Sequence, residues 1–84
     1  MWLLLHERSP IREYPDLQIV AIALEVDDLF DYAFEKYNVD NIEFTEHIDK
    51  TKTWLYNLGW DEFDKSVSYW LWIVEFEGQF ILGK

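Results

Sequence analysis

The stretch SYWLWIVEF at residues 68–76 decides the fold of this chain. Its aromatic and β-branched composition is typical of a β-strand. Successive side chains of a strand point to opposite faces of a sheet, so Leu71 and Ile73 share one face while Trp70 and Trp72 share the other. Both faces are apolar, so the sheet that contains this strand needs cover on both sides.

Further strands are expected on either side of this stretch along the chain. Residues 2–7 form one, and residues 17–24 form a second with a nearly continuous apolar run. The proline-containing loop 8–15 between them suits a long-looped antiparallel hairpin. Residues 77–78 are a two-residue turn signal, so residues 79–82 are expected to close a terminal hairpin.

Two helices are expected in the middle of the chain. The first covers 27–37, where Asp27 can act as the cap and apolar residues follow helical spacing. Apolar positions at i, i+3, i+7 and i+10 predict a second helix over 46–58, with a short strand before it as an open alternative. The expected order is β-β-α-(β)-α-β-β: an α+β domain with a small, mainly antiparallel sheet and two helices packed on one face.

The length and charge of the chain limit the classes of function. Eighty-four residues are expected to form a single compact acidic domain over 1–84, since domains usually need roughly 100–200 residues. Seventeen acidic against seven basic residues give a net charge of −10, which argues against binding nucleic acid or an anionic membrane directly. No apolar run approaches the roughly 20 residues of a membrane helix, and cysteine is absent. We therefore expect a cytoplasmic protein without disulfides.

The chemistry-bearing residues do not define a reaction. No serine lies in a G-x-S-x-G elbow, and the three glycines are too scattered for a phosphate loop. His47 lies among Glu43, Glu46 and Asp49, but these residues match no metal-binding motif and suit a solvated acidic segment. The sequence therefore predicts no enzyme, no cofactor and no metal site, with metal binding kept as a minor alternative.

Acidic residues are the first candidates for contact with a partner. Three of them fall within a sector of roughly 60° on the first expected helix, opposite its apolar stripe. They are either the solvated side of an amphipathic helix or part of a patch that binds a basic surface. Three more lie in the connector 60–65. The six carboxylates are Asp28, Asp31, Glu35, Asp61, Glu62 and Asp64.

Tryptophans are the second candidates. Trp70 and Trp72, together with Trp2, are expected on a second apolar face of the sheet, where they would mediate self-association. The simplest such assembly is a homodimer formed sheet to sheet or edge to edge. The alternative is that the loop 8–15 covers this face.

An opening strand, an acidic helix DDLFDYAFEKY at 27–37 and a Trp-rich end together resemble, in layout and charge, the small acidic proteins encoded by phages and prophages. That broad class includes inhibitors of restriction enzymes, DNA-repair glycosylases and CRISPR effectors, some of which are DNA mimics. The resemblance implies a non-enzymatic inhibitor or regulator that occupies a basic surface of a host protein. The alternative function is a structural or assembly module that self-associates through its Trp-rich sheet.

Overall fold

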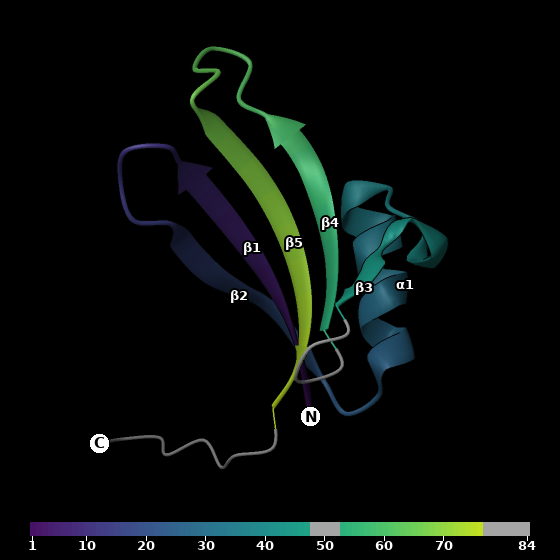
Figure 1. Cartoon of the computed structure of the whole chain (residues 1–84). Helices are drawn as coiled ribbons and strands as arrows, with labels where there is room; N and C mark the ends of the chain where they lie inside the picture. Colours follow the sequence, from purple (N-terminus) through teal and green to yellow (C-terminus); the bar gives the residue numbers. More distant parts are fainter. Residues whose placement is uncertain (48–52, 77–84) are drawn as a thin grey trace, which may run out of the picture.

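Figure 1 shows a computed structural model of the chain, which describes residues 1–47 and 53–76. The described residues form one antiparallel sheet with strand order β2-β1-β5-β4-β3, and one α-helix. The elements in chain order are β1 (Trp2–Pro10), β2 (Asp16–Ala23), α1 (Val26–Tyr37), the 3₁₀ turn η1 (Asn41–Glu43), β3 (Thr45–His47), β4 (Thr53–Trp60) and β5 (Val67–Glu75).

β5, which contains most of the 68–76 stretch, is the central strand of the sheet (Figure 1). It pairs with β1 over its whole length, from Val67 opposite Pro10 to Glu75 opposite Trp2, and with β4 on its other edge. Its apolar residues on both faces suit a strand in the interior of the sheet, where both faces are more covered than those of an edge strand. The strands expected at 2–7, 17–24 and 68–76 coincide with β1, β2 and β5.

The core lies between the sheet and α1. Leu29 and Ala33 of the helix are buried against Leu4 of β1 and against Leu71 and Ile73 of β5. The helix coincides with the expected one at 27–37, but its N-cap position is Glu25, which makes no side-chain capping bond, so Asp27 lies in the first turn instead. Asn38 ends the helix in the left-handed conformation, at φ 57°.

The predicted fold class was wrong, because the second helix does not exist. Residues 45–47 are β3 and residues 53–60 are β4. The apolar spacing of 46–58 fits both a helix and a strand. Pairing with β5 selects the strand, since it places Trp54 opposite Ile73 in the core and Leu55 opposite Trp72 on the other face. One helix therefore covers one face of the described sheet.

Gly59 takes part in a β-bulge of β4 rather than ending a helix. The pairing of β4 with β5 shifts register between Asn57 and Gly59, and Gly59 has φ 111°, where a side chain is strained. The terminal hairpin expected at 77–82 lies outside the described residues. No helix within the described ranges is long and apolar enough to cross a membrane.

Candidate protein-interaction surface

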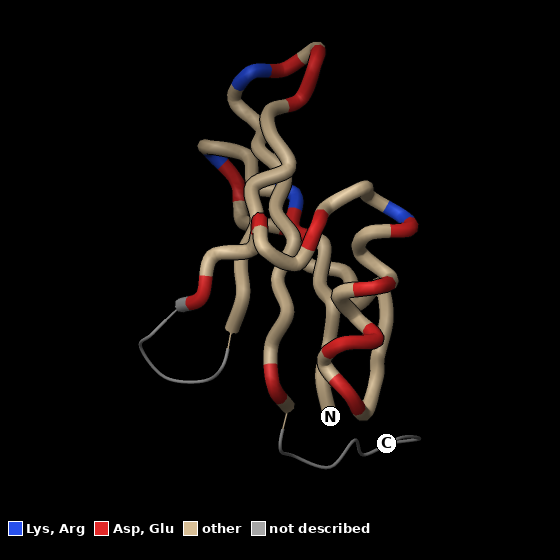
Figure 2. The backbone as a smooth tube through the Cα atoms, turned by 90° about the vertical axis from the view of Figure 1, so that its right-hand side faces the viewer, with Lys and Arg blue, Asp and Glu red and all other residues tan. Residues whose placement is uncertain are grey.

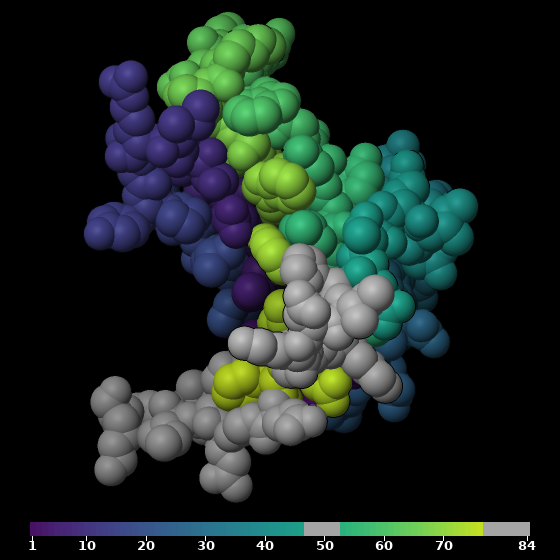
Figure 3. All heavy atoms as spheres, in the orientation of Figure 1, coloured from purple at the N-terminus to yellow at the C-terminus, as the bar shows by residue number. Residues whose placement is uncertain are grey.

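The sheet face opposite α1 is largely apolar, and no helix formed by residues 1–47 or 53–76 lies over it. Directly opposed residues of an antiparallel pair share a face, so Leu5 lies beside Ile19 of β2 and Trp72 of β5, on the side away from Leu4 and the core. Figure 3 shows side chains of β1, β5 and β4 at the surface on the viewer's side of the sheet. We name the apolar side chains on this side the open face: Leu3, Leu5, Leu17, Ile19, Ile22, Leu55, Trp60, Trp70, Trp72 and Val74.

Four residues of the open face are more than half exposed. Leu17, Ile19 and Ile22 of β2 expose 56%, 54% and 52% of their surface, and Trp60 of β4 exposes 56%. Single exposed apolar side chains are common in soluble proteins, whereas a contiguous group of them marks an interaction site. On the open face, the exposed residues of β2 and β4 are joined by the partly exposed rings of Trp70 and Trp72, on a twisted, hydrogen-bonded sheet (Figure 1).

The two tryptophans at the middle of the open face are held by hydrogen bonds. The Trp70 indole N–H donates to Ser68 Oγ at 3.0 Å, and the Trp72 indole N–H donates to Glu7 Oε1 at 3.1 Å. Each polar group of these rings is therefore satisfied within the sheet. Each ring is thereby held in place, and the partly exposed ring of Trp70 has the property of a rigid anchor residue.

Of the three tryptophans expected on this face, Trp2 lies on the other one. Its ring packs against Trp54, with centroids 5.4 Å apart, on the side covered by α1. The pairing of Trp2 with Glu75 rather than with Val74 sets this orientation. Trp60 was not predicted on this face, because residues 60–65 were assigned to a connector. Trp60 follows an alternating apolar run, which is a strand signal, and it is the last residue of β4.

The loop 8–15 does not cover the open face. Residues 8–10 belong to β1, and the remainder is exposed: Ile11 and Tyr14 leave 69% and 94% of their surface in water. The alternative, in which the loop 8–15 covers the open face, is therefore wrong.

At one end of the open face, the loop between β4 and β5 is organised by Asp61. Its Oδ1 accepts the N–H groups of Phe63 and Asp64 at 2.8 and 3.0 Å, and its Oδ2 accepts the Tyr69 hydroxyl at 2.6 Å. The bond from Tyr69, followed by the two N–H bonds, lowers the pKa of Asp61, and the same bond raises the pKa of Tyr69. Asp61 is thus an ionised structural residue.

Asp64 has a similar local function. It accepts both the N–H and the hydroxyl of Ser66, at 3.0 and 2.6 Å, and these bonds lower its pKa. With Asp61 and Asp64 engaged in the loop, its tip presents Glu62, which is exposed, and Phe63, which is 94% exposed. The loop therefore presents an exposed aromatic ring beside carboxylates beyond the end of the sheet.

The six carboxylates expected to contact a partner do not form one surface. Asp28, Asp31 and Glu35 are exposed on α1, whereas Asp61, Glu62 and Asp64 lie in the β4–β5 loop beyond the end of the sheet. Figure 2 shows the acidic positions of the helix and those of this loop as separate groups, and Figure 1 separates the same two elements. The protein therefore has two separate acidic surfaces, one on α1 and one in the β4–β5 loop.

The acidic surface of α1 adjoins a shallow hollow of about 400 Å³. Phe34, which is 53% exposed, lies in its wall together with further aromatic and polar side chains. The lining residues are Asp27, Phe30, Asp31, Phe34, Asp40 and Asn41.

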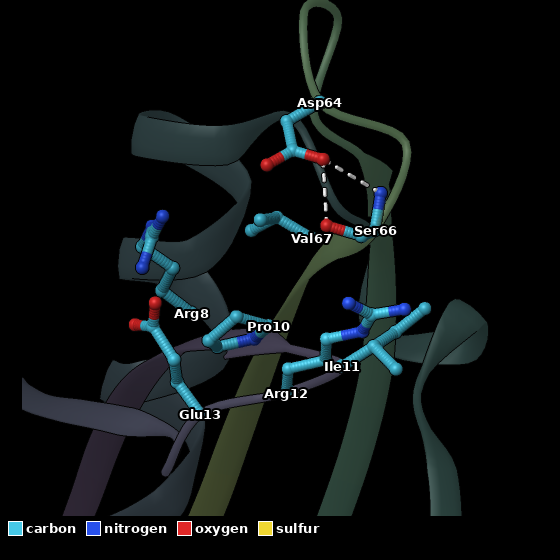
Figure 4. A pocket seen from close by; sticks show the side chains of 8 residues that line it. All are labelled: Arg8, Pro10, Ile11, Arg12, Glu13, Asp64, Ser66 and Val67. Atoms are coloured by element: carbon cyan, nitrogen blue, oxygen red, sulfur yellow. Dashed lines mark hydrogen bonds between the residues drawn. The ribbon is translucent and has the colours of Figure 1, made fainter.

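A second hollow, of about 420 Å³, lies where the β1–β2 loop meets the β4–β5 loop (Figure 4). Arg8 and Arg12, the only arginines of the chain, line it from different sides. Glu13 projects toward Arg8, and Asp64 lies opposite (Figure 4). Because carboxylates balance the guanidinium groups, this hollow has no net positive charge with which to attract an anion.

The acidic residues around His47 show no metal-binding arrangement. Glu43 Oε2 accepts the N–H of Asp40 at 2.8 Å as part of a capping box of η1. Within residues 1–47 and 53–76, no three His, Asp or Glu side chains are grouped as metal ligands, and Asp49 lies outside these ranges.

Comparison with known proteins found no family model, no curated protein and no solved structure that matches this chain. Function is therefore inferred from the chemistry of the surface.

Proposed function

We propose that this protein is a non-enzymatic binding module that holds another protein against its open face. The observation that carries the proposal is the group of more than half-exposed apolar side chains on β2 and β4, with the anchored rings of Trp70 and Trp72 between them. Protein interfaces are enriched in such aromatic anchors, and the burial of apolar area drives their association.

The charge of the molecule favours a partner that has an apolar patch bordered by Lys and Arg. The net charge of −10 attracts a basic surface over long distance, and Glu62 is exposed in the loop that follows Trp60 of the open face. A phage-type inhibitor of a host defence or nucleic-acid-handling protein in the cytoplasm is the biological form of this proposal. It requires no cofactor and no catalytic residue.

The test is capture of a partner from bacterial lysate by the tagged protein and by two matched variants. Trp60→Ser with Trp70→Ser removes two rings of the open face, and Phe34→Ser removes an exposed ring of α1 as the control. We expect one protein with a basic surface to be captured by wild type and by Phe34→Ser, and lost with the double variant. Equal capture by all three proteins would contradict the proposal.

The acidic surface of α1 is the second candidate, because exposed Phe34 lies beside Asp27 and Asp31 in a hollow that suits a Lys or Arg side chain. The triple change Asp28→Asn, Asp31→Asn and Glu35→Gln separates the two candidates. If the open face binds the partner, this variant captures it more slowly but retains it. If α1 binds the partner, capture is lost.

A further inference from the structure

β2 is a long strand at the edge of the described sheet. The strand order places it at one end, where β1 is its only strand neighbour among residues 1–47 and 53–76, and Figure 1 shows α1 on the β4–β3 side of the molecule. The opposite edge, β3, has three residues, whereas β2 has eight. A free edge presents unpaired N–H and C=O groups that can pair with another strand.

β2 has few of the features that protect edge strands. Natural edges carry Lys, Pro, inward-pointing charges or bulges, and in β2 these are limited to Asp16 at its first position and one bulge, since residues 17–23 contain neither proline nor a charged residue. Its one irregularity is a bulge around Val20, which leaves residues 16–19 and 21–23 in regular register with β1. The side chains along it are also apolar and exposed: Leu24 exposes 78%, following the half-exposed Leu17, Ile19 and Ile22.

We infer that β2 pairs antiparallel with β2 of a second copy, joining two five-stranded sheets into one continuous sheet. A strand that pairs with its own copy about a two-fold axis must run antiparallel. In a pair centred on the strand, the two Asp16 residues lie at opposite ends, about 23 Å apart at roughly 3.3 Å per residue, which exceeds the screening length of about 10 Å. Asp16 of one copy lies opposite Ala23 of the other, two residues from Glu25, so like charges meet only at the two ends of the contact and none lies within residues 17–23.

The two-fold axis stands perpendicular to the joined sheet. Both helices then lie on one side, and both open faces lie on the other, so the dimer presents two adjacent copies of the apolar surface. The pairing uses the edge of the sheet and does not depend on the partner proposed for the open face.

Analytical ultracentrifugation of the whole chain over a range of concentrations tests the inference. The variant Ile19→Lys with Ile22→Lys places cations along β2, and Ile42→Lys with Phe63→Lys, at exposed positions in η1 and the β4–β5 loop, is the control with the same charge change. We expect wild type and the control to reach twice the monomer mass, while the β2 variant remains a monomer. A monomeric wild type, or a dimeric β2 variant, would overturn the inference.

Disulfide cross-linking is the second test, and it covers the case in which the lysine variant does not fold. The chain contains no cysteine, so a single Cys reports only its own contact. In the centred pair only residues near the two-fold axis face their own copies, and Leu17 lies opposite Ile22 of the other copy. We therefore expect Ile19→Cys alone, and an equal mixture of Leu17→Cys and Ile22→Cys, to form a covalent dimer faster under mild oxidation than Ile42→Cys does. Cross-linking no faster than that of Ile42→Cys, both for Ile19→Cys and for the mixture, contradicts the pairing.

Trp60→Ser with Trp70→Ser separates this inference from the proposed function. An edge-paired dimer survives the loss of these rings, whereas a dimer packed face to face does not. Loss of the dimer in this variant would overturn the edge pairing. Retention of the dimer together with loss of the captured partner would support both proposals.

Discussion

Tyr69 and Asp61 link the sheet to the β4–β5 loop through a single 2.6 Å hydrogen bond. On its other side, the Tyr69 ring lies 5.7 Å from the His6 ring, which in turn stacks on Tyr37 of α1 at 6.2 Å. Loop, sheet and helix are thus connected through side chains of four residues. The loop that carries Glu62 and Phe63 is thus held both by the local hydrogen bonds of Asp61 and Asp64 and by this chain of contacts to the sheet and the helix.

The pH dependence of the β4–β5 loop follows from the pKa shifts of Asp61 and Tyr69. The pKa of Asp61 is lowered on folding, so its contribution to stability is present above the ordinary value of 3.8 and is lost as pH falls through the lowered pKa. The pKa of Tyr69 is raised, so its contribution is present below 10.0 and is lost as pH rises through the raised pKa. Between these limits, the hydrogen bonds of the pair remain intact.

Tyr69→Phe should therefore raise the pKa of Asp61 toward its ordinary value, because the first cause of the lowering is removed. The carboxyl ¹³C shift of Asp61, followed by NMR titration, measures this directly. Ser66→Ala is the matched control, since it should raise the pKa of Asp64 and leave that of Asp61 nearly unchanged. An unchanged Asp61 titration in Tyr69→Phe would contradict the role assigned to this bond.

The two faces of the sheet differ in what an identical substitution should cost. Leu71 of β5 is fully buried under α1, whereas Leu17 of β2 exposes 56% of its surface on the open face. Leu71→Ala should lower the free energy of unfolding by about 2–5 kcal/mol, and Leu17→Ala by under about 1 kcal/mol. Urea unfolding of both variants measures the difference. Equal losses would mean that the face assignment is wrong.

The β-bulge of β4 gives a second prediction at the level of secondary-structure elements. Gly59→Ala places a Cβ where no atom lies within 4 Å, so any loss of stability comes from the backbone conformation at φ 111°. We expect a loss of about 1–3 kcal/mol in thermal or urea unfolding. Glu62→Ala, in the neighbouring loop, should stay within about 0.5 kcal/mol of wild type. A neutral Gly59→Ala would show that β4 accommodates a side chain by shifting its register.

Periodicity predicts those elements of this fold whose pattern is unambiguous. Residues 27–37 have one apolar stripe and form α1, and the alternating residues of β5 correctly place Trp70 and Trp72 on one face. Residues 46–58 were misassigned because their apolar spacing fits two periods, and the choice depends on pairing with β5 far along the chain. The orientation of Trp2 depends on the same long-range register, which no local pattern contains.

The whole molecule carries a charge of −10, so its two proposed associations should respond to salt in opposite directions. Two copies of the chain repel each other, whereas a basic partner is attracted. Salt shortens the screening length from about 10 Å at 0.1 M to about 3 Å at 1 M and weakens both effects.

Added NaCl should therefore tighten the dimer and weaken capture of the partner. Sedimentation equilibrium at several salt concentrations measures the first, and the rate of partner binding on a surface sensor measures the second. The matched reference is the triple variant of α1, with Asp28→Asn, Asp31→Asn and Glu35→Gln, whose lower charge should flatten both dependences. A dimer that dissociates as salt rises would contradict pairing through an uncharged strand.

A ribosome delivers β1 first and β5 last of the described strands, yet the two lie side by side in the middle of the sheet. Leu71 and Ile73, which complete the core around Leu4 and Leu29, emerge only with β5. Until then, β1 lacks its inner neighbour, and the helix has an incomplete surface to pack against. The nascent chain must therefore wait for its last strand before it folds, and a product truncated before residue 67 would expose its apolar strands to proteases and aggregation.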